Sequence, residues 1–221
     1  MVAGDAAVTR LKPGRKQVFT RDQAIAAALA EGVGSFTLRA VAARLGVRPS
    51  ALYREFGSRE DLQIAAMAQI ARDFLTDSQW ATWQDGLRHM VDTQWRMLTL
   101  HPEAANVIIT QPEACAVAMP HFAALVDKLV DLGIPGGRDA ATFALDFAGD
   151  TTMMTFVSMQ PYVTVDAEGR TGLERATSHM GDAPDVFDMA GMGERGFLDR
   201  KIAFIIAGLE AGLLPPATPG A

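Results

Sequence analysis

The spacing of apolar and polar residues near the start of the chain predicts short helices separated by glycines. Thr20 stands where a helix cap is expected, and apolar residues follow it at helical spacing until Gly32 and Gly34 stop the pattern. These apolar residues are Ala24, Ile25, Ala28 and Leu29. A first helix is therefore predicted to begin after Thr20 and to end before Gly32.

Two shorter helices are predicted next. Thr37 can cap a helix of about two turns that ends at Gly46, and Pro49 suits the first turn of another that Gly57 ends. Ser58 and Asp61 have the spacing of a capping box and predict the start of a longer fourth helix. Two short helices around a glycine-containing turn, with a helix on each side, indicate a helix-turn-helix whose second helix fits a major groove.

The pattern stays helical through most of the remaining chain. Helices are predicted over residues 83–100, 103–110, 112–133 with a bend at Pro120, 138–159 with Pro161 closing it, and 196–214. Residues 163–195 show no sustained period, which predicts a long mobile connection with one short turn of helix. We expect an all-α fold, with an N-terminal three-helix helix-turn-helix domain and a C-terminal antiparallel helical domain.

These predictions divide the chain into four parts. Residues 1–18 are predicted to be a flexible basic arm, 19–66 the helix-turn-helix domain, 67–214 the helical domain, and 215–221 a tail. The arm could follow a DNA backbone or minor groove, and the alternative is a terminus without a role.

Composition narrows the class of protein. The chain has 221 residues and is 49% hydrophobic, which is enough to fill a core. Cys115 is its single cysteine, so no internal disulfide can form, and no secretory signal pattern opens the sequence. The apolar stretches are broken well before the roughly 18 residues that a membrane helix needs. We expect a cytoplasmic protein without a membrane segment.

Charge is unevenly distributed along the chain. The net charge is −6, yet residues 1–60 hold ten basic and five acidic side chains, a balance of +5 that leaves −11 for the remainder. A basic N-terminal quarter on an acidic body suits local contact with phosphates. The alternative is a basic surface that is merely solvated.

The segment from Thr20 to Leu62 contains three motifs, which are Phe36-Thr37-Leu38-Arg39-x-Val41-Ala42-x-x-Leu45-Gly46-Val47, Leu52-Tyr53-x-x-Phe56 and Ser58-Arg59-x-x-Leu62. Through these motifs the segment resembles the tetracycline-repressor (TetR) family of transcriptional regulators. The resemblance covers about a fifth of the chain, and the C-terminal region is similar to the family in helical layout alone.

The resemblance implies a DNA-binding role for individual residues of this segment. It assigns phosphate contacts to Thr37, Tyr53 and Arg59. Hydroxyl groups and an arginine at helix starts suit phosphate oxygens, and arginine can form bidentate pairs with guanine. The residues assigned to the base-facing end of the recognition helix are Arg39, Arg48, Pro49 and Ser50, and Arg54 completes the predicted DNA-binding set.

Two residues of the motif have competing interpretations. Tyr53 could also lie half-buried against Phe56, and both roles are compatible. Glu55 departs from the family pattern, because an acidic side chain near phosphates repels the DNA backbone. It could accept from a cytosine, face away from DNA, or pair with Arg54 or Arg59, and we favour pairing.

The resemblance also implies that the C-terminal domain binds a small-molecule effector and forms a homodimer through its last two long helices. Small residues that would let helices approach closely occur on both of these helices. The alternative is ordinary packing within one chain. The residues concerned are Ala140, Ala144, Ala148, Thr152, Gly208 and Gly212.

An effector pocket is expected among the middle helices. Methionine and aromatic side chains suit an apolar ligand of variable shape, although the same residues at helical spacing are common in cores. The predicted ligand-binding residues are Trp95, Phe122, Phe143, Phe147 and Met154. The sequence predicts a repressor that its effector releases from operator DNA by a shift in population.

Other functional classes find little support. The sequence contains none of the common hydrolase, metalloprotease or phosphate-loop motifs, and its four histidines lack metal-ligand spacing. We expect no enzymatic activity, no metal and no cofactor. The alternative function is that of a helical scaffold or interaction protein without sequence-specific DNA binding.

Overall fold

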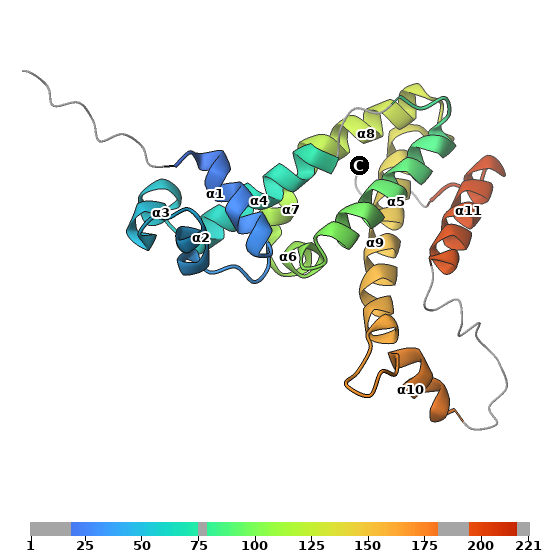
Figure 1. The fold of residues 1–221 in the computed structure, drawn as a ribbon. Coiled ribbons are helices and arrows are strands. Elements are labelled where there is room, and N and C mark those ends of the chain that lie inside the picture. The colour runs from blue at the N-terminus through green and yellow to red at the C-terminus, as the bar shows by residue number, and fades with distance from the viewer. Residues whose placement is uncertain (1–18, 75–78, 181–194, 216–221) are drawn as a thin grey trace, which may run out of the picture.

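The structure is a computed structural model that describes residues 19–74, 79–180 and 195–215, and within these residues it contains eleven helices and no strand. The predicted all-α fold is confirmed. The first four helices agree with the sequence pattern: α1 (Arg21–Glu31), α2 (Leu38–Arg44), α3 (Pro49–Phe56) and α4 (Arg59–Phe74). They form the compact group at one end of the molecule in Figure 1.

Side chains cap the starts of these helices as the sequence predicts. Thr20 Oγ1 accepts from the Gln23 amide at 3.2 Å, and Gln23 Oε1 accepts from the Thr20 amide at 2.8 Å. Ser58 and Asp61 make the same reciprocal pair before α4, at 3.0 and 3.2 Å. Each pair satisfies two amides that a helix start otherwise leaves without a partner, which fixes where α1 and α4 begin.

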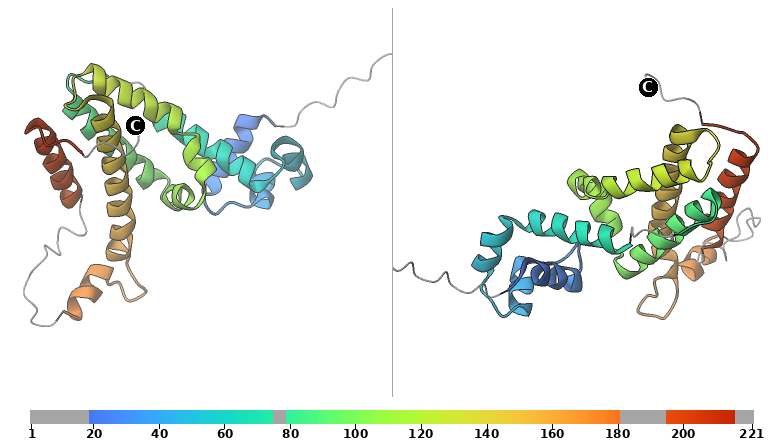
Figure 2. Two further views of the ribbon diagram at one scale, coloured as in Figure 1. Left: turned by 180° about the vertical axis from the view of Figure 1, so that it is seen from behind. Right: turned by 90° about the horizontal axis from the view of Figure 1, so that it is seen from above.

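The remaining helices form a larger C-terminal body. The long helix α9 runs down its middle, α11 lies beside it, and α10 lies at its far end (Figures 1 and 2). These helices are α5 (Trp83–Leu100), α6 (Ala104–Thr110), α7 (Pro112–Ala116), α8 (Met119–Asp131), α9 (Gly137–Val163), α10 (Gly172–Ser178) and α11 (Gly196–Glu210).

Two proline predictions are wrong. The predicted bent helix over residues 112–133 is two helices, α7 and α8, and Pro120 lies in the first turn of α8, where its missing amide costs nothing. Pro161 does not close α9, which continues to Val163. Because Pro161 lies in the last turn, it removes only one hydrogen bond from the helix.

The described residues directly after α9, 164–180, have a defined local structure. Val165 pairs with Thr171 in an isolated bridge, and Thr171 then caps α10 in a capping box with Glu174. Gly172 is required there, because a Cβ at this position would stand 1.8 Å from the Pro161 carbonyl oxygen. The short helix predicted within residues 163–195 is therefore α10. Residues 181–194, the predicted arm at 1–18 and residues 216–221 of the tail lie outside the described residues.

The buried side chains form two hydrophobic cores. The first contains the interior of α1–α4 together with Leu98 of α5, Val107 of α6 and Phe156 of α9. The second lies between α5, α8, α9 and α11 and includes Leu87. Trp95 is half-buried and packs against both cores. The hydrophobic interior of the helix-turn-helix therefore continues into α5, α6 and α9, which follow α4 in the sequence.

Among the described helices, none combines the length and the apolar character that are needed to span a bilayer.

Candidate nucleic-acid interface

The turn between α2 and α3 has the geometry of a Schellman motif. Gly46 has a φ of +67°, its amide donates to the Ala43 carbonyl at 3.1 Å, and the Val47 amide donates to the Ala42 carbonyl at 2.9 Å. Only glycine adopts such a φ without strain, so Gly46 ends α2 and turns the chain into α3. The two helices are thereby held in a fixed relation, as recognition of a groove requires.

The outer face of this unit carries almost all of the predicted DNA-binding residues. Tyr53 is 55% exposed, so it is a surface residue, and Phe56 alone of this pair enters the core. The side chains of Arg39, Arg48 and Arg54 make no hydrogen bond or ion pair with any residue that the structure describes. The exposed members of the predicted set are Thr37, Arg39, Arg48, Pro49, Ser50, Tyr53 and Arg54.

Thr37 combines two functions at the start of α2. Its Oγ1 accepts a hydrogen bond from the Ala40 amide at 3.1 Å and so caps the helix. The hydroxyl proton is not used by that bond, and the side chain is exposed. A capping threonine at an exposed helix start can therefore still donate to an anion.

Arg59 has a different position from the rest of the predicted set. Its guanidinium donates to the carbonyls of Phe36 at 2.8 Å and Gly34 at 2.7 Å and to Gln63 Oε1 at 3.2 Å, and it lies over the Phe36 ring. Arg59 is half-buried and holds the loop between α1 and α2. Its predicted phosphate contact gains no support from this geometry, because three of its five donors already have partners.

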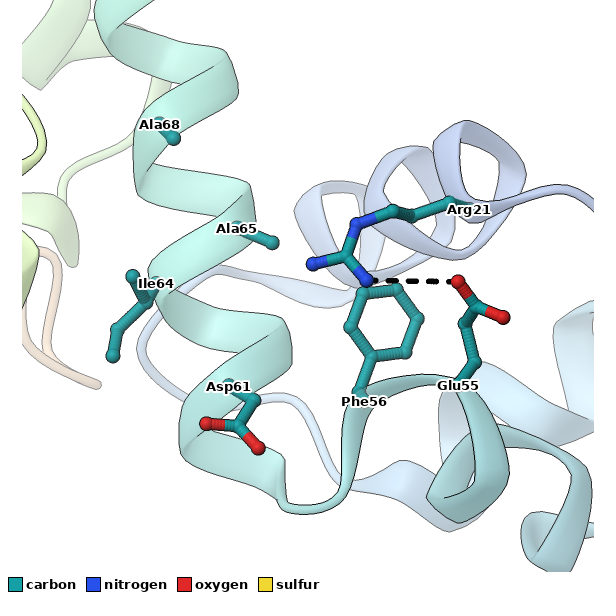
Figure 3. Close-up of a pocket in the computed structure, with 7 residues that line it drawn as sticks. All are labelled: Arg21, Glu55, Phe56, Asp61, Ile64, Ala65 and Ala68. Carbon is teal, nitrogen blue, oxygen red and sulfur yellow. Dashed lines mark ion pairs between the residues drawn. The ribbon is translucent and has the colours of Figure 1, made fainter.

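Glu55 forms an ion pair, as we favoured, but neither Arg54 nor Arg59 is the partner. Arg21 extends from α1, lies over the Phe56 ring, and approaches Glu55 Oε1 at 3.5 Å (Figure 3). Glu31 likewise pairs with Arg44 at 2.7 Å. These two carboxylates are thus neutralised by arginines other than the three unpaired ones, which leaves the exposed face of α2 and α3 with a positive charge.

The predicted ligand-binding residues do not come together. Trp95 is half-buried and makes an edge-to-face contact with Phe156 at 5.4 Å, and Phe122 is half-buried on α8. Phe143, Phe147 and Met154 lie on the exposed side of α9, with 45%, 37% and 56% of their surfaces accessible. The buried side of α9 is its alanine side, because small residues allow close approach of the neighbouring helices.

The small residues of α9 therefore pack within the chain. Ala140, Ala144, Ala148 and Thr152 are all buried, so the alternative of ordinary intramolecular packing holds for them. On α11, a Cβ at Gly208 would meet nothing within 4 Å, and Gly212 lies beyond the helix end with a φ of +77°.

Two buried polar groups on residues that adjoin Trp95 and Phe156 in the sequence were not predicted. Gln94 Oε1 and Thr155 Oγ1 are shielded from solvent and have no hydrogen-bond partner, although Gln94 Nε2 donates to the Gly149 carbonyl at 3.1 Å. Buried polar atoms usually have partners. The helical spacing of these polar residues carries no signal that would have identified them.

Within the described residues, no group of three or more histidine, cysteine, aspartate or glutamate side chains is placed to hold a metal ion.

Comparisons with known proteins agree with this geometry. Residues 21–66 match the family model for bacterial regulatory proteins of the tetR family. A solved structure described as a possible TetR family transcriptional regulator from Streptomyces coelicolor A3(2) superposes with a TM-score of 0.62 at 18% identity, covering 87% of this chain and 99% of its own. A second, described as a candidate transcriptional regulator from the same organism, gives 0.62 at 19%, covering 89% and 99%. No curated protein matches the chain. At these identities the superpositions establish the fold.

Proposed function

Because residues 21–66 form an N-terminal domain of the tetR family of bacterial regulatory proteins, we propose that this protein is a ligand-responsive, homodimeric repressor of transcription. The observation that carries the proposal is the exposed face of α2 and α3. There, Arg39, Arg48 and Arg54 have no partner among the described residues, while Glu31 and Glu55 are paired elsewhere. A rigid helix-turn-helix with unpaired arginines is suited to the major groove of DNA.

The residues divide by chemistry into two kinds of contact. Arg48, the residue directly before α3, supplies planar donors for a bidentate pair with guanine at the end of α3 that enters the groove. Arg39, which was expected at the same end of the recognition helix, lies instead in the first turn of α2 and is proposed to reach a second guanine from there. Thr37 and Tyr53 supply hydroxyls for phosphates and fix the register on the duplex. Pro49, Ser50 and Arg54 line the same face, and Arg59 acts indirectly by holding the domain together.

The homodimer is proposed to form through α9 and α11, the last two long helices. Phe143, Phe147 and Met154 make an exposed apolar stripe on α9, and Phe204 of α11 is 79% exposed. An exposed stripe of this kind marks an interface, because water contact with large apolar side chains is unfavourable. The open space above Gly208 would let a partner helix approach α11 closely.

The effector site is proposed at the boundary of the two cores, beside Trp95. Aromatic rings of Trp95 and Phe156 supply an apolar wall, and the unsatisfied Gln94 Oε1 and Thr155 Oγ1 supply polar contacts. These groups fit a small, largely apolar effector with at least one hydrogen-bond donor for Gln94. Phe122 remains a candidate from α8. Because both cores meet here, a ligand would change how the body packs against the DNA-binding end.

The experiment that tests the proposal is selection of genomic DNA fragments by the purified protein, followed by gel shifts on the selected fragment. We expect the selected fragments to share two half-sites about 34–36 Å apart, the spacing that a two-fold dimer requires. Arg48→Ala should abolish selection of a common sequence. Failure of the wild-type protein to enrich any sequence would contradict the proposal and favour a scaffold. Loss of the shift on addition of a candidate effector would identify that effector.

A further inference from the structure

The loop between α1 and α2, residues 32–37, is held by side chains from two other parts of the chain. Arg59 donates to the Gly34 and Phe36 carbonyls, and Gln63 Nε2 donates to the Val33 carbonyl at 2.6 Å. Both of these residues lie on α4, within the same domain. The third side chain, Glu103, comes from the C-terminal body.

Glu103 stands directly before α6 and reaches across to the loop. A single carboxylate oxygen, Oε2, accepts from the Gly34 amide at 2.8 Å and from the Ser35 amide at 3.1 Å. Hydrogen bonds to a charged acceptor are about twice as strong as neutral ones. Glu103 makes no ion pair among the described residues, and the two loop amides are the donors that its carboxylate binds there.

The loop is shaped to receive this carboxylate. A Cβ added at Gly34 would stand 2.8 Å from Glu103 Cβ and 3.2 Å from its Oε2, so the backbone approaches as closely as glycine allows. The backbone of Gly34 has an ordinary negative φ, and the close approach therefore explains this glycine without any conformational requirement.

The other end of α6 is tied to the same loop. Gln111, which follows α6, donates to Gln63 Oε1 at 2.6 Å, and Gln63 in turn donates to the Val33 carbonyl. Gln63 is 1% exposed, so this relay is shielded from water. Both ends of a short helix of the body are thus joined to the loop that ends at Thr37, the cap of α2.

We infer that Glu103 is a positioning residue for DNA binding, through which α6 sets the orientation of α2 and α3. The inference rests on the proposed DNA-binding function and adds a route for its regulation. A shift of α6 in the body would move the Glu103 carboxylate, release or pull the two loop amides, and change the placement of Thr37 and the helices behind it. DNA would contact α2 and α3, but the orientation of these two helices is set partly by Glu103, which lies outside the helix-turn-helix.

The test uses the full-length protein and compares Glu103→Ala, Glu103→Gln and Gly34→Ala with the wild type. Glu103→Ala removes the acceptor, and Glu103→Gln keeps an amide oxygen that can accept. Gly34→Ala leaves Glu103 in place but adds a Cβ on the loop that would displace its carboxylate. Amide hydrogen exchange of a peptide covering residues 32–36 and affinity for the selected DNA fragment are both measured. Glu113→Gln, at an exposed site on α7, is the charge-matched control.

A second control separates positioning from loss of stability. Val126→Ala removes apolar contacts in the second core, away from the loop, and should lower the Tm without changing DNA affinity. Glu103→Ala and Gly34→Ala should raise exchange of the loop amides about tenfold and weaken DNA binding about 5- to 20-fold. Glu103→Gln should recover most of both losses, and Glu113→Gln should show neither.

Each result bears on a different part of the proposal. Unchanged loop exchange in Glu103→Ala would overturn the contact itself. Faster loop exchange in Glu103→Ala with unchanged DNA affinity would overturn the positioning role. The same role would be overturned if Val126→Ala, with a Tm equal to that of Glu103→Ala, lost as much DNA affinity. Failure of the wild-type protein to bind any fragment would overturn the proposed function and the DNA role of Glu103 together, whereas the exchange result would still show whether Glu103 holds the loop.

Discussion

The helix-turn-helix end and the C-terminal body differ in what they leave exposed. The first presents arginines without partners, Arg39, Arg48 and Arg54, and pairs its Glu31 and Glu55 elsewhere. The second presents large apolar side chains along α9 and on α11. A surface of unpaired cations attracts a polyanion, and an apolar stripe attracts another apolar surface. The two ends are therefore suited to two different kinds of macromolecular partner.

The two regions have different surfaces, but the hydrophobic core of the first extends into the second. The first core includes Leu98, Val107 and Phe156 from the body, and the second begins only with the earlier part of α5. Two helices, α5 and α9, thus contribute to both cores. A change in the body can reach the DNA-binding end through packed side chains as well as through the Glu103 carboxylate.

The largest expected effects are on stability, and they come from substitutions in α5, which contributes to both cores. Leu87 and Leu98 are both fully buried on this helix, one in each core. Leu87→Ala and Leu98→Ala should each lower the free energy of unfolding by about 2–5 kcal/mol. Hydrogen exchange should locate the damage differently: in α1–α4 for Leu98→Ala, and in α8, α9 and α11 for Leu87→Ala. The same exchange pattern in both variants would show that the two cores act as one.

The apolar surface of the body predicts the next effect. Phe147→Arg or Phe204→Arg should weaken dimerisation by about 2 kcal/mol or more, because a charge replaces an apolar anchor in the interface. Sedimentation equilibrium measures the change. Ile109→Arg, at a site on α6 that is 57% exposed, is the matched control and should leave the dimer intact. Dimerisation that survives both phenylalanine substitutions would place the interface elsewhere.

Two arginines of the helix-turn-helix predict opposite results. Arg59→Ala should lower the free energy of unfolding by about 1–3 kcal/mol, because the carbonyls of Gly34 and Phe36 lose their donor. Arg39→Ala should leave stability within about 0.5 kcal/mol of the wild type, since its side chain is exposed and unpaired. Denaturant unfolding measures both. Equal stability of the two variants would contradict the structural role of Arg59.

The smallest effect concerns pH at the junction of the two regions. His101 follows α5 and packs edge-to-face against Phe74 of α4 at 6.1 Å. Burial lowers the pKa of His101, and the nearby Asp73 carboxylate partly opposes that shift. As pH falls through about 6.5, the unfolded chain takes up a proton that the folded one does not, so stability decreases slightly.

His101→Gln should remove this contribution. Its unfolding free energy should fall less between pH 7.5 and pH 5.5 than that of the wild type, measured by denaturant unfolding at both pH values. An identical pH dependence in the two proteins would show that another group is responsible.

The DNA-binding end could be predicted in detail because its signals are local. The capping residues Thr20, Thr37 and Ser58 and the glycine at 46 each act within a few positions of themselves, and the observed helices begin and end where they predict. The partners of Glu55 and Arg59 could not be predicted in this way. They lie 34 and 23 to 25 residues away in the sequence, and only the folded arrangement brings them together.

The body was harder to predict because α9 carries two apolar stripes. One is made of alanines and the other of larger side chains such as Phe143 and Phe147, and helical spacing does not distinguish the inner stripe from the outer. The larger residues were expected inside, but close packing of neighbouring helices selects the alanines. The contact between Glu103 and Gly34 joins residues 69 positions apart and left no signal in the sequence.

The most direct test of the proposed DNA binding is its salt dependence, measured on the selected DNA fragment for the wild type and for the double variant Arg48→Ala with Tyr53→Phe. We expect wild-type affinity to fall steeply with salt concentration. The double variant should bind the fragment weakly, because it loses the proposed guanine contact of Arg48 and the proposed phosphate hydrogen bond of Tyr53. Binding that is absent or indifferent to salt in the wild type, or unchanged in the double variant, would contradict the proposal.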